Sequence, residues 1–189
     1  MNLESIMRKR SVKLFFLLIS ASLIMTASAA VYYALLMEPE VTISAAPVHF
    51  TDGDDSSAAG YSPGTNETYA NLSLKAYPNV TLTYEQAVNI TNTGDSDHDI
   101  RLRHVSISPA SGDDVGNFTS IIFYLIDATG DVKATFDYNT TLDSWNTPET
   151  TGWMLIAQNA EWTIKIETKA VAGAKDGVSC SITIAIDVR

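Results

Sequence analysis

Apolar side chains recur at every second position through most of the chain after Val41, and this spacing limits the fold more than any other feature. The last run is the clearest, and its predicted buried face carries Val178, Cys180, Ile182, Ile184, Ile186 and Val188. A period of two matches a strand, whose successive side chains point to opposite faces of a sheet. The pattern therefore predicts strands with one buried face and one solvent-facing face.

The same alternation occurs at residues 72–76, 80–84, 100–107 and 162–168. Within 100–107 the apolar phase changes, because Ile107 follows the phase of Val105 and not that of Ile100. Residues 121–126 form a continuous apolar run of strand length, which predicts burial on both faces.

Segments rich in Gly, Asn and Asp separate these runs at 92–95, 109–114, 127–131 and 172–177. Residues 127–131 join two runs of strand length and predict a hairpin, whereas 51–66 read as a long loop. Many strands about 8–12 residues apart are typical of a sandwich or a jelly roll. We therefore predict an all-β, jelly-roll-like β-sandwich over residues 41–189.

The first 29 residues have the layout of a secretory signal peptide. Arg8, Lys9, Arg10 and Lys13 form a basic start, residues 14–25 are apolar, and Ala27-x-Ala29 fits a cleavage site. This layout predicts an extracellular or cell-surface protein that meets a membrane only during export.

Two alternatives to a cleaved signal peptide stay open. The apolar stretch continues to Met37, so residues 14–37 could instead span a bilayer and hold a membrane-anchored cell-surface binding domain. A pilin-type leader cut near Arg10 would place Lys13 inside an assembly helix, which counts against it.

Charge and cysteine content exclude some classes of protein. The chain has 12 Lys and Arg against 22 Asp and Glu residues. Four cations and one acid precede Ala30, so the segment from Ala30 onward has 8 against 21 and a net charge of −13. This balance argues against nucleic-acid binding. Cys180 is the only cysteine, so no intramolecular disulfide forms, and its apolar surroundings predict a buried thiol.

No motif indicates catalysis, a cofactor or a metal. His49, His98 and His104 lack metal-site spacing, and there is no G-x-S-x-G sequence. The acidic runs at 52–55, 95–99 and 113–114 fit solvated loops better than a calcium site, because the full EF-hand pattern is missing. Sugar stacking is the alternative use of the tryptophans, although most are expected in the core or on strand faces: Trp145, Trp153 and Trp162.

Six Asn-x-Ser/Thr triplets are candidate N-glycosylation sites in an exported protein. Five are retained as candidates: Asn66, Asn71, Asn79, Asn117 and Asn139. The sixth, Asn89, is expected to lie within a strand and is the least favoured.

An apolar segment stands ahead of the predicted domain. It comprises Ala30, Val31, Tyr32, Tyr33, Ala34, Leu35, Leu36 and Met37. Glu38-Pro39 then interrupts it, since proline cannot donate to a sheet, and residues 30–40 read as a strand with a hinge. Burial of each large side chain is worth about 1.5–3 kcal/mol, so water is an unfavourable place for this segment.

The segment can be buried within its own domain, in a membrane, or in a neighbouring copy. In the last case it adds a strand to the sheet of that copy, which is donor-strand complementation. Head-to-tail donation does not close on itself and generates a filament. The strand predicted at 178–188 is a candidate neighbour of the incoming strand.

The chain resembles the TasA/camelysin family in the order of its segments. A leader and an apolar strand precede Val41-Thr42-Ile43-Ser44, then a loop, then residues 74–84 and 88–94. Asn92-Thr93-Gly94 fits the family's Asn-x-Gly, whereas Pro78-Asn79 stands where Pro-Gly is usual. The archaeal bundling pilins and thread filaments of this family are jelly-roll subunits that donate an N-terminal strand and build extracellular matrix.

The resemblance implies a homopolymer subunit for adhesion and biofilm matrix, whose partners are other copies of itself and neighbouring filaments in bundles. Some camelysin relatives are labelled metalloproteases. A secreted metallo-hydrolase is therefore a further alternative, although the chain lacks a metal-binding motif.

Overall fold

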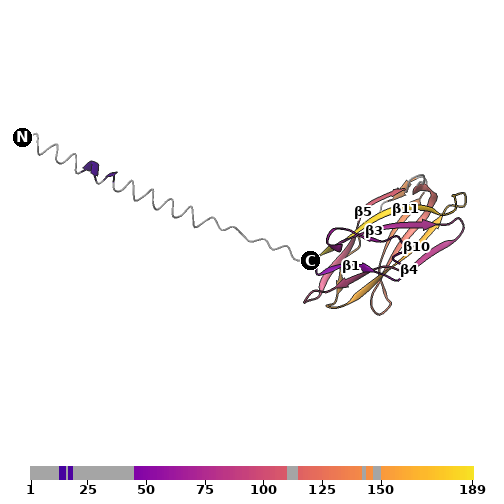
Figure 1. Cartoon of the computed structure of the whole chain (residues 1–189), viewed down its shortest axis with the longest axis horizontal. Coiled ribbons are helices and arrows are strands. Elements are labelled where there is room, and N and C mark those ends of the chain that lie inside the picture. The colour runs from indigo at the N-terminus through magenta and orange to yellow at the C-terminus, as the bar shows by residue number, and fades with distance from the viewer. Residues whose placement is uncertain (1–12, 16, 19–44, 110–114, 142–143, 147–149) are drawn as a thin grey trace, which may run out of the picture. The chain divides into compact units, whose positions relative to one another are not determined.

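The structure, a computed structural model, describes residues 13–15, 17–18, 45–109, 115–141, 144–146 and 150–189 (Figure 1). The chain divides into two units, Met1–Ser44 and Ala45–Arg189. The predicted donor segment, 30–37, and most of the predicted signal peptide lie outside the described residues. Among the residues that are described, no helix is both long and apolar enough to cross a bilayer.

The second unit is a sandwich of two antiparallel sheets. In spatial order, the first sheet contains β1 (Val48–Asp52), β4 (Thr81–Asn92), β10 (Glu161–Ala170), β6 (Phe118–Ile126), β7 (Val132–Thr141) and β8 (Ser144–Asn146). The second sheet contains β2 (Ser62–Pro63), β3 (Tyr69–Ala76), β11 (Val178–Val188), β5 (His98–Pro109) and β9 (Met154–Ile156). Two single 3-10 turns, η1 (Thr65–Glu67) and η2 (Val115–Asn117), connect strands.

The strand order is that of a jelly roll. One set of four neighbours is β3-β11-β5-β9 and the facing set is β4-β10-β6-β7, with β1, β2 and β8 added at the edges. The chain passes from one sheet to the other between β3 and β4, β4 and β5, β5 and β6, and again between β10 and β11. The predicted all-β, jelly-roll-like sandwich is confirmed.

The core lies between the sheets and follows the period-two pattern. Along β10 the buried positions are Trp162, Ile164, Ile166, Thr168 and Ala170, and the residues between them are more exposed. Cys180 is fully buried on β11, as predicted. Because the single thiol cannot form an internal crosslink, the fold depends on this apolar burial.

The prediction that residues 121–126 are buried on both faces is wrong. In β6 Ile121, Phe123 and Leu125 are buried, whereas Ile122 and Ile126 on the other face are only partly buried. The reason is that a sandwich of two sheets covers one face of each strand, and no further layer covers the outer face of this sheet among the described residues.

The change of phase in β5 corresponds to a β-bulge. The register against β11 shifts between Thr183, which faces Ser106, and Ile184, which faces His104. Val105 is therefore the extra residue, and 39% of it is exposed. A bulge puts two residues opposite one and so moves Ile107 back to the core side.

Candidate functional site

Strand β5 has an open edge over half of its length. Its neighbour β9 pairs with only three of its twelve residues, His98, Asp99 and Ile100. Just beyond β9, the Thr151 backbone N–H donates to the Leu102 carbonyl at 3.1 Å, and the Leu102 N–H donates to Thr151 Oγ1 at 2.8 Å. From Arg103 to Ser108, β11 is the only strand neighbour of β5 in the described part of the chain.

This placement corrects the prediction that the strand at 178–188 borders an incoming strand. That strand is β11, which lies between β3 and β5 and pairs with both along most of its length. Since both of its edges are occupied, β11 has no edge left for an added strand.

The open part of β5 lacks the features that usually protect a strand edge. Residues 105–108 are Val105, Ser106, Ile107 and Ser108, with no charge and no proline before Pro109. On the same side of the sandwich, the outer edge of β7 carries Lys133 and Asp137, which are both exposed. Charged side chains at an edge oppose the addition of a strand, so β5 is the more accessible of the two.

Two polar side chains connect the sheets behind this edge. The His104 ring of β5 lies edge-on to Tyr138 of β7, with ring centroids 5.5 Å apart, and His104 Nδ1 hydrogen-bonds the Tyr138 hydroxyl. Burial lowers the pKa of His104 and raises the pKa of Tyr138, so both groups are held in their neutral forms. An added strand would meet an interior without charged groups here.

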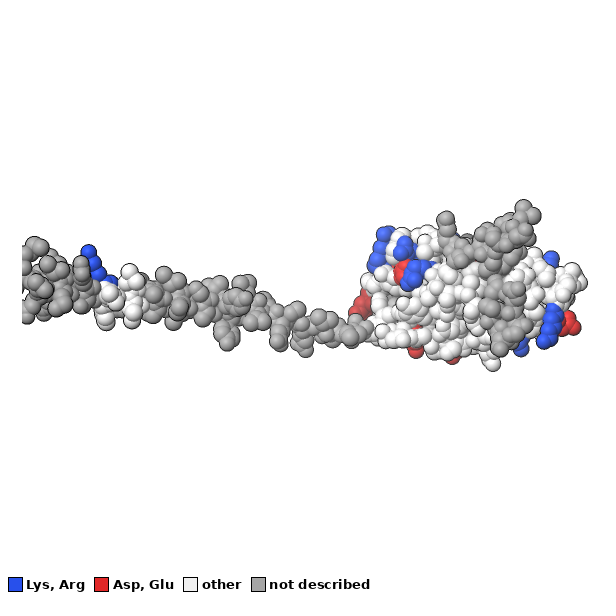
Figure 2. Space-filling view, turned by 90° about the horizontal axis from the view of Figure 1, so that it is seen from above, with Lys and Arg blue, Asp and Glu red and all other residues white. Residues whose placement is uncertain are grey.

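The view in Figure 2 looks onto the domain from the upper side of Figure 1, along which β5 runs. On this face the Lys, Arg, Asp and Glu side chains gather toward the two ends of the domain, and the other described atoms between them are uncharged. A strand added beside β5 would therefore meet little charge along its middle.

The chain enters the domain at the end where β5 begins. The Thr93 backbone N–H donates to the Pro47 carbonyl at 2.8 Å. Asn92 is fully buried there, and its Nδ2 donates to the carbonyls of Ile156 at 3.2 Å and Ala157 at 3.1 Å. The amide of Asn92 thus ties the end of β4 to the end of β9.

The same side chain also organises the turn of the Asn-x-Gly motif. Asn92 Oδ1 accepts the Gly94 N–H at 3.0 Å, and Nδ2 also donates to the Ser96 carbonyl at 2.9 Å. A Cβ on Gly94 would lie 2.9 Å from Pro47 Cβ, which is too close. The two conserved atoms of the turn, an amide and a missing Cβ, therefore fix the end of the domain where the chain enters.

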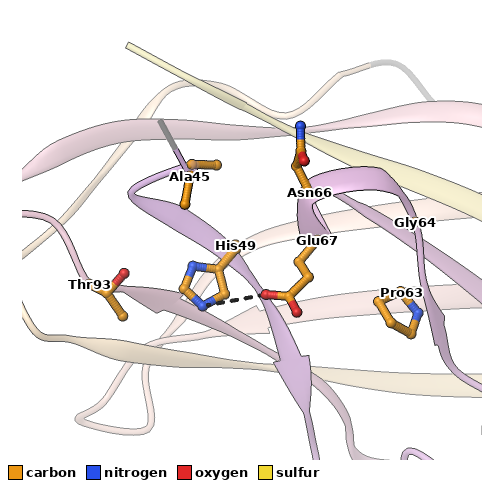
Figure 3. A pocket seen from close by; sticks show the side chains of 8 residues that line it. Ala45, His49, Pro63, Gly64, Asn66, Glu67 and Thr93 are labelled. Atoms are coloured by element: carbon orange, nitrogen blue, oxygen red, sulfur yellow. Dashed lines mark ion pairs between the residues drawn. The ribbon is translucent and has the colours of Figure 1, made fainter. Parts of the chain in front are cut away.

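A shallow pocket lies beside this entry point (Figure 3). It has a volume of about 430 Å³ and is lined by Ala45, Ala46, His49, Pro63, Gly64, Asn66, Glu67 and Thr93. His49 Nε2 and Glu67 Oε2 face each other across it at 3.9 Å. One histidine and one carboxylate do not make a metal site.

A tryptophan stacks with two arginines near the start of β5. The guanidinium groups of Arg101 and Arg189 lie 4.7 Å and 4.4 Å from the centre of the Trp153 ring. Arg101 Nε is 2.9 Å from Asp187 Oδ2, and Arg189 Nε is 3.1 Å from Asp99 Oδ2. These contacts hold the C-terminus and the segment before β9 against β5.

The structure does not bring the three tryptophans together. Trp162 is in the core, Trp153 is stacked as above, and the side chain of Trp145 in β8 lies outside the described residues. The predicted acidic loops are partly used by backbone contacts: Asp55 Oδ2 accepts the N–H groups of Glu85 and Gln86, at 2.7 Å and 3.2 Å. Within the described ranges no three His, Cys, Asp or Glu residues gather as metal ligands would.

The predicted glycosylation sites differ in exposure. Asn66, Asn71 and Asn79 are exposed, and Asn117 is partly buried. Asn139 lies in β7, and its side chain is outside the described part. Asn89 lies inside β4 and is 8% exposed, with its Nδ2 3.2 Å from Glu161 Oε1.

Sequence reasoning missed the open edge of β5. The alternation identified the strand, but the pairing of its two edges depends on the order of strands in space. Comparison with known proteins adds no identity, because no protein-family model matches the chain and no curated protein matches it significantly.

Proposed function

We propose that this protein is the structural subunit of an extracellular filament, assembled head to tail by donor-strand complementation. In this assembly the segment 30–37 of one copy adds to the jelly roll of the next copy. The filament would serve cell adhesion and the matrix of a biofilm, and the subunit carries no catalytic role.

The observation that supports this proposal is the incomplete pairing of β5. The strand has twelve residues and β9 pairs with three of them. An edge strand with free backbone groups is a template for pairing with another chain. The chain also supplies an apolar segment of strand length ahead of the domain, at residues 30–37.

The experiment is deletion of residues 30–37, followed by negative-stain microscopy of the culture supernatant. We expect fibres from the wild type and soluble monomers from the deletion. A matched control keeps the length and replaces Val31, Tyr33 and Leu35 with Ser, which should also abolish fibres because a polar segment gains little from burial. Unchanged fibres after deletion would overturn the proposal.

N-terminal sequencing of the extracellular form tests the export step. A start at Ala30 supports cleavage of the signal peptide and leaves residues 30–37 free to be donated. An intact start in a membrane fraction, without fibres, would favour the membrane-anchored alternative.

A further inference from the structure

We propose that the donated segment lies beside β5 and runs parallel to it, with residue 30 toward β9 and residue 37 toward Ser108. This inference rests on the proposed function, since it assumes that residues 30–37 are donated. It assigns the acceptor edge and the direction of the incoming strand.

The length of the segment suits the open edge. Eight extended residues span about 26 Å at about 3.3 Å per residue. The open part of β5 runs from Arg103 to Ser108, which is shorter, so the segment can pair along all of it. Val105, which is 39% exposed, and the partly buried Ile107 would lose much of their contact with water.

The direction follows from which end of the edge is blocked. β9 and Thr151 occupy the positions beside residues 98–102 of β5. An added strand must therefore approach from the Ser108 end. In a donated segment, residue 37 is the one joined through residues 38–44 to its own domain, so it stays nearest to Ser108 and residue 30 advances toward β9.

A segment folded back into its own sandwich would run the opposite way. Its domain begins at Ala45, close to Pro47 and Asn92, and Asn92 binds the carbonyl of Ile156, the partner of His98. Residue 37 would then lie near the start of β5, and the segment would be antiparallel to β5. The direction of the strand thus separates donation between copies from insertion within one copy.

The alternation of the segment fits a strand with one inner face. Val31, Tyr33, Leu35 and Met37 are all large, whereas the alternate set contains Ala30 and Ala34. We place the larger set toward the interior, beside Ile107 and the uncharged pair of His104 and Tyr138.

The test is disulfide cross-linking in assembled fibres. The acceptor cysteines are Val105→Cys and Ser108→Cys, at two exposed positions, and the donor cysteines are Tyr32→Cys and Leu36→Cys. Disulfides need Cα atoms about 4.4–6.8 Å apart, so they distinguish neighbours from residues a few positions away. Each donor variant is mixed with each acceptor variant, so that any bond joins two chains, and fully buried Cys180 alone is the control.

The parallel arrangement predicts cross-linked dimers for Tyr32 with Val105 and for Leu36 with Ser108, at least tenfold more than for the two crossed pairs. Predominance of the crossed pairs, or bonds that form only when both cysteines share one chain, would overturn the inference. Wild-type fibres without any cross-link at β5 would overturn it and leave the filament proposal intact. Absence of wild-type fibres would overturn both.

A second measurement keeps the test decisive if the cysteine variants fail to assemble. Hydrogen–deuterium exchange is compared between wild-type fibres and the monomer that lacks residues 30–37. We expect exchange in a peptide covering residues 103–108 to slow at least tenfold in the fibre. Equal exchange in the two samples would reject β5 as the acceptor.

Discussion

Replacement of Asn92 by alanine tests the claim that one buried amide holds together the end of the domain where the chain enters. The substitution removes the acceptor of Gly94 N–H and the donor to the carbonyls of Ser96, Ile156 and Ala157. Asn92 has no exposed surface, so water does not replace all of these bonds without rearrangement.

The expected loss of stability is about 3 kcal/mol. Each hydrogen bond contributes about 1 kcal/mol net, and a buried carbonyl left without a donor costs about 1–3 kcal/mol. The Ile156 carbonyl is the buried acceptor in this set, whereas the bonds to Ser96 and Ala157 are partly buried and easier to rehydrate. For a domain of this size, 3 kcal/mol lowers Tm by about 10 °C.

The assay is urea unfolding followed by tryptophan fluorescence, in the background that lacks residues 30–37 so that assembly does not contribute. Asn71→Ala is the matched control, because Asn71 is exposed on β3 and accepts one bond, from Thr183 Oγ1 at 2.8 Å. We expect the control to lose less than about 1 kcal/mol. If Asn92→Ala is as stable as the control, the amide does not anchor β9 and our account of this end is wrong.

Three further predictions concern stacking, pH and modification. Trp153→Ala should cost about 1–2 kcal/mol, because two cation–π contacts of about 0.5–1 kcal/mol each are lost, and urea unfolding measures this. Burial, with nearby carboxylates, raises the pKa of Tyr61 to about 12, so its contribution is complete below pH 10 and is lost as pH rises toward 12; Tyr61→Phe should flatten unfolding curves in that window. Glycopeptide mass spectrometry of the native protein should find glycan at Asn66 or Asn79, which are exposed, and none at Asn89; glycan on Asn89 would contradict its burial in β4.

Much of the fold could be predicted from the alternation of side chains alone. The hydrophobic effect acts on each strand locally, so the buried faces of β10 and β11 are readable from residues such as Ile164 and Ile182. Even the bulge left a trace, because Ile107 changes phase at Val105. The hairpin predicted at 127–131 also forms, and Asp127 Oδ1 accepts the Thr129 N–H at 2.9 Å.

The pairing of strand edges could not be read in the same way. Backbone hydrogen bonds look alike for every sequence, so β11 and β5 were equally good candidates to border an added strand until their neighbours were known. The Arg101–Trp153 stacking and the Asn92 contacts to β9 join residues far apart in sequence, and no local pattern predicts them.

The position of β1 has a mechanical consequence. β1 is the first strand after Ala45 and pairs with β4 from Val48, opposite Asn92, to Asp52, opposite Val88. A pull on the preceding chain, directed away from the sandwich along the strands, would slide β1 past β4 and load all of these pairs together. Such shear resists force better than peeling one pair at a time, so tension on the N-terminal side would meet the domain in its stronger direction.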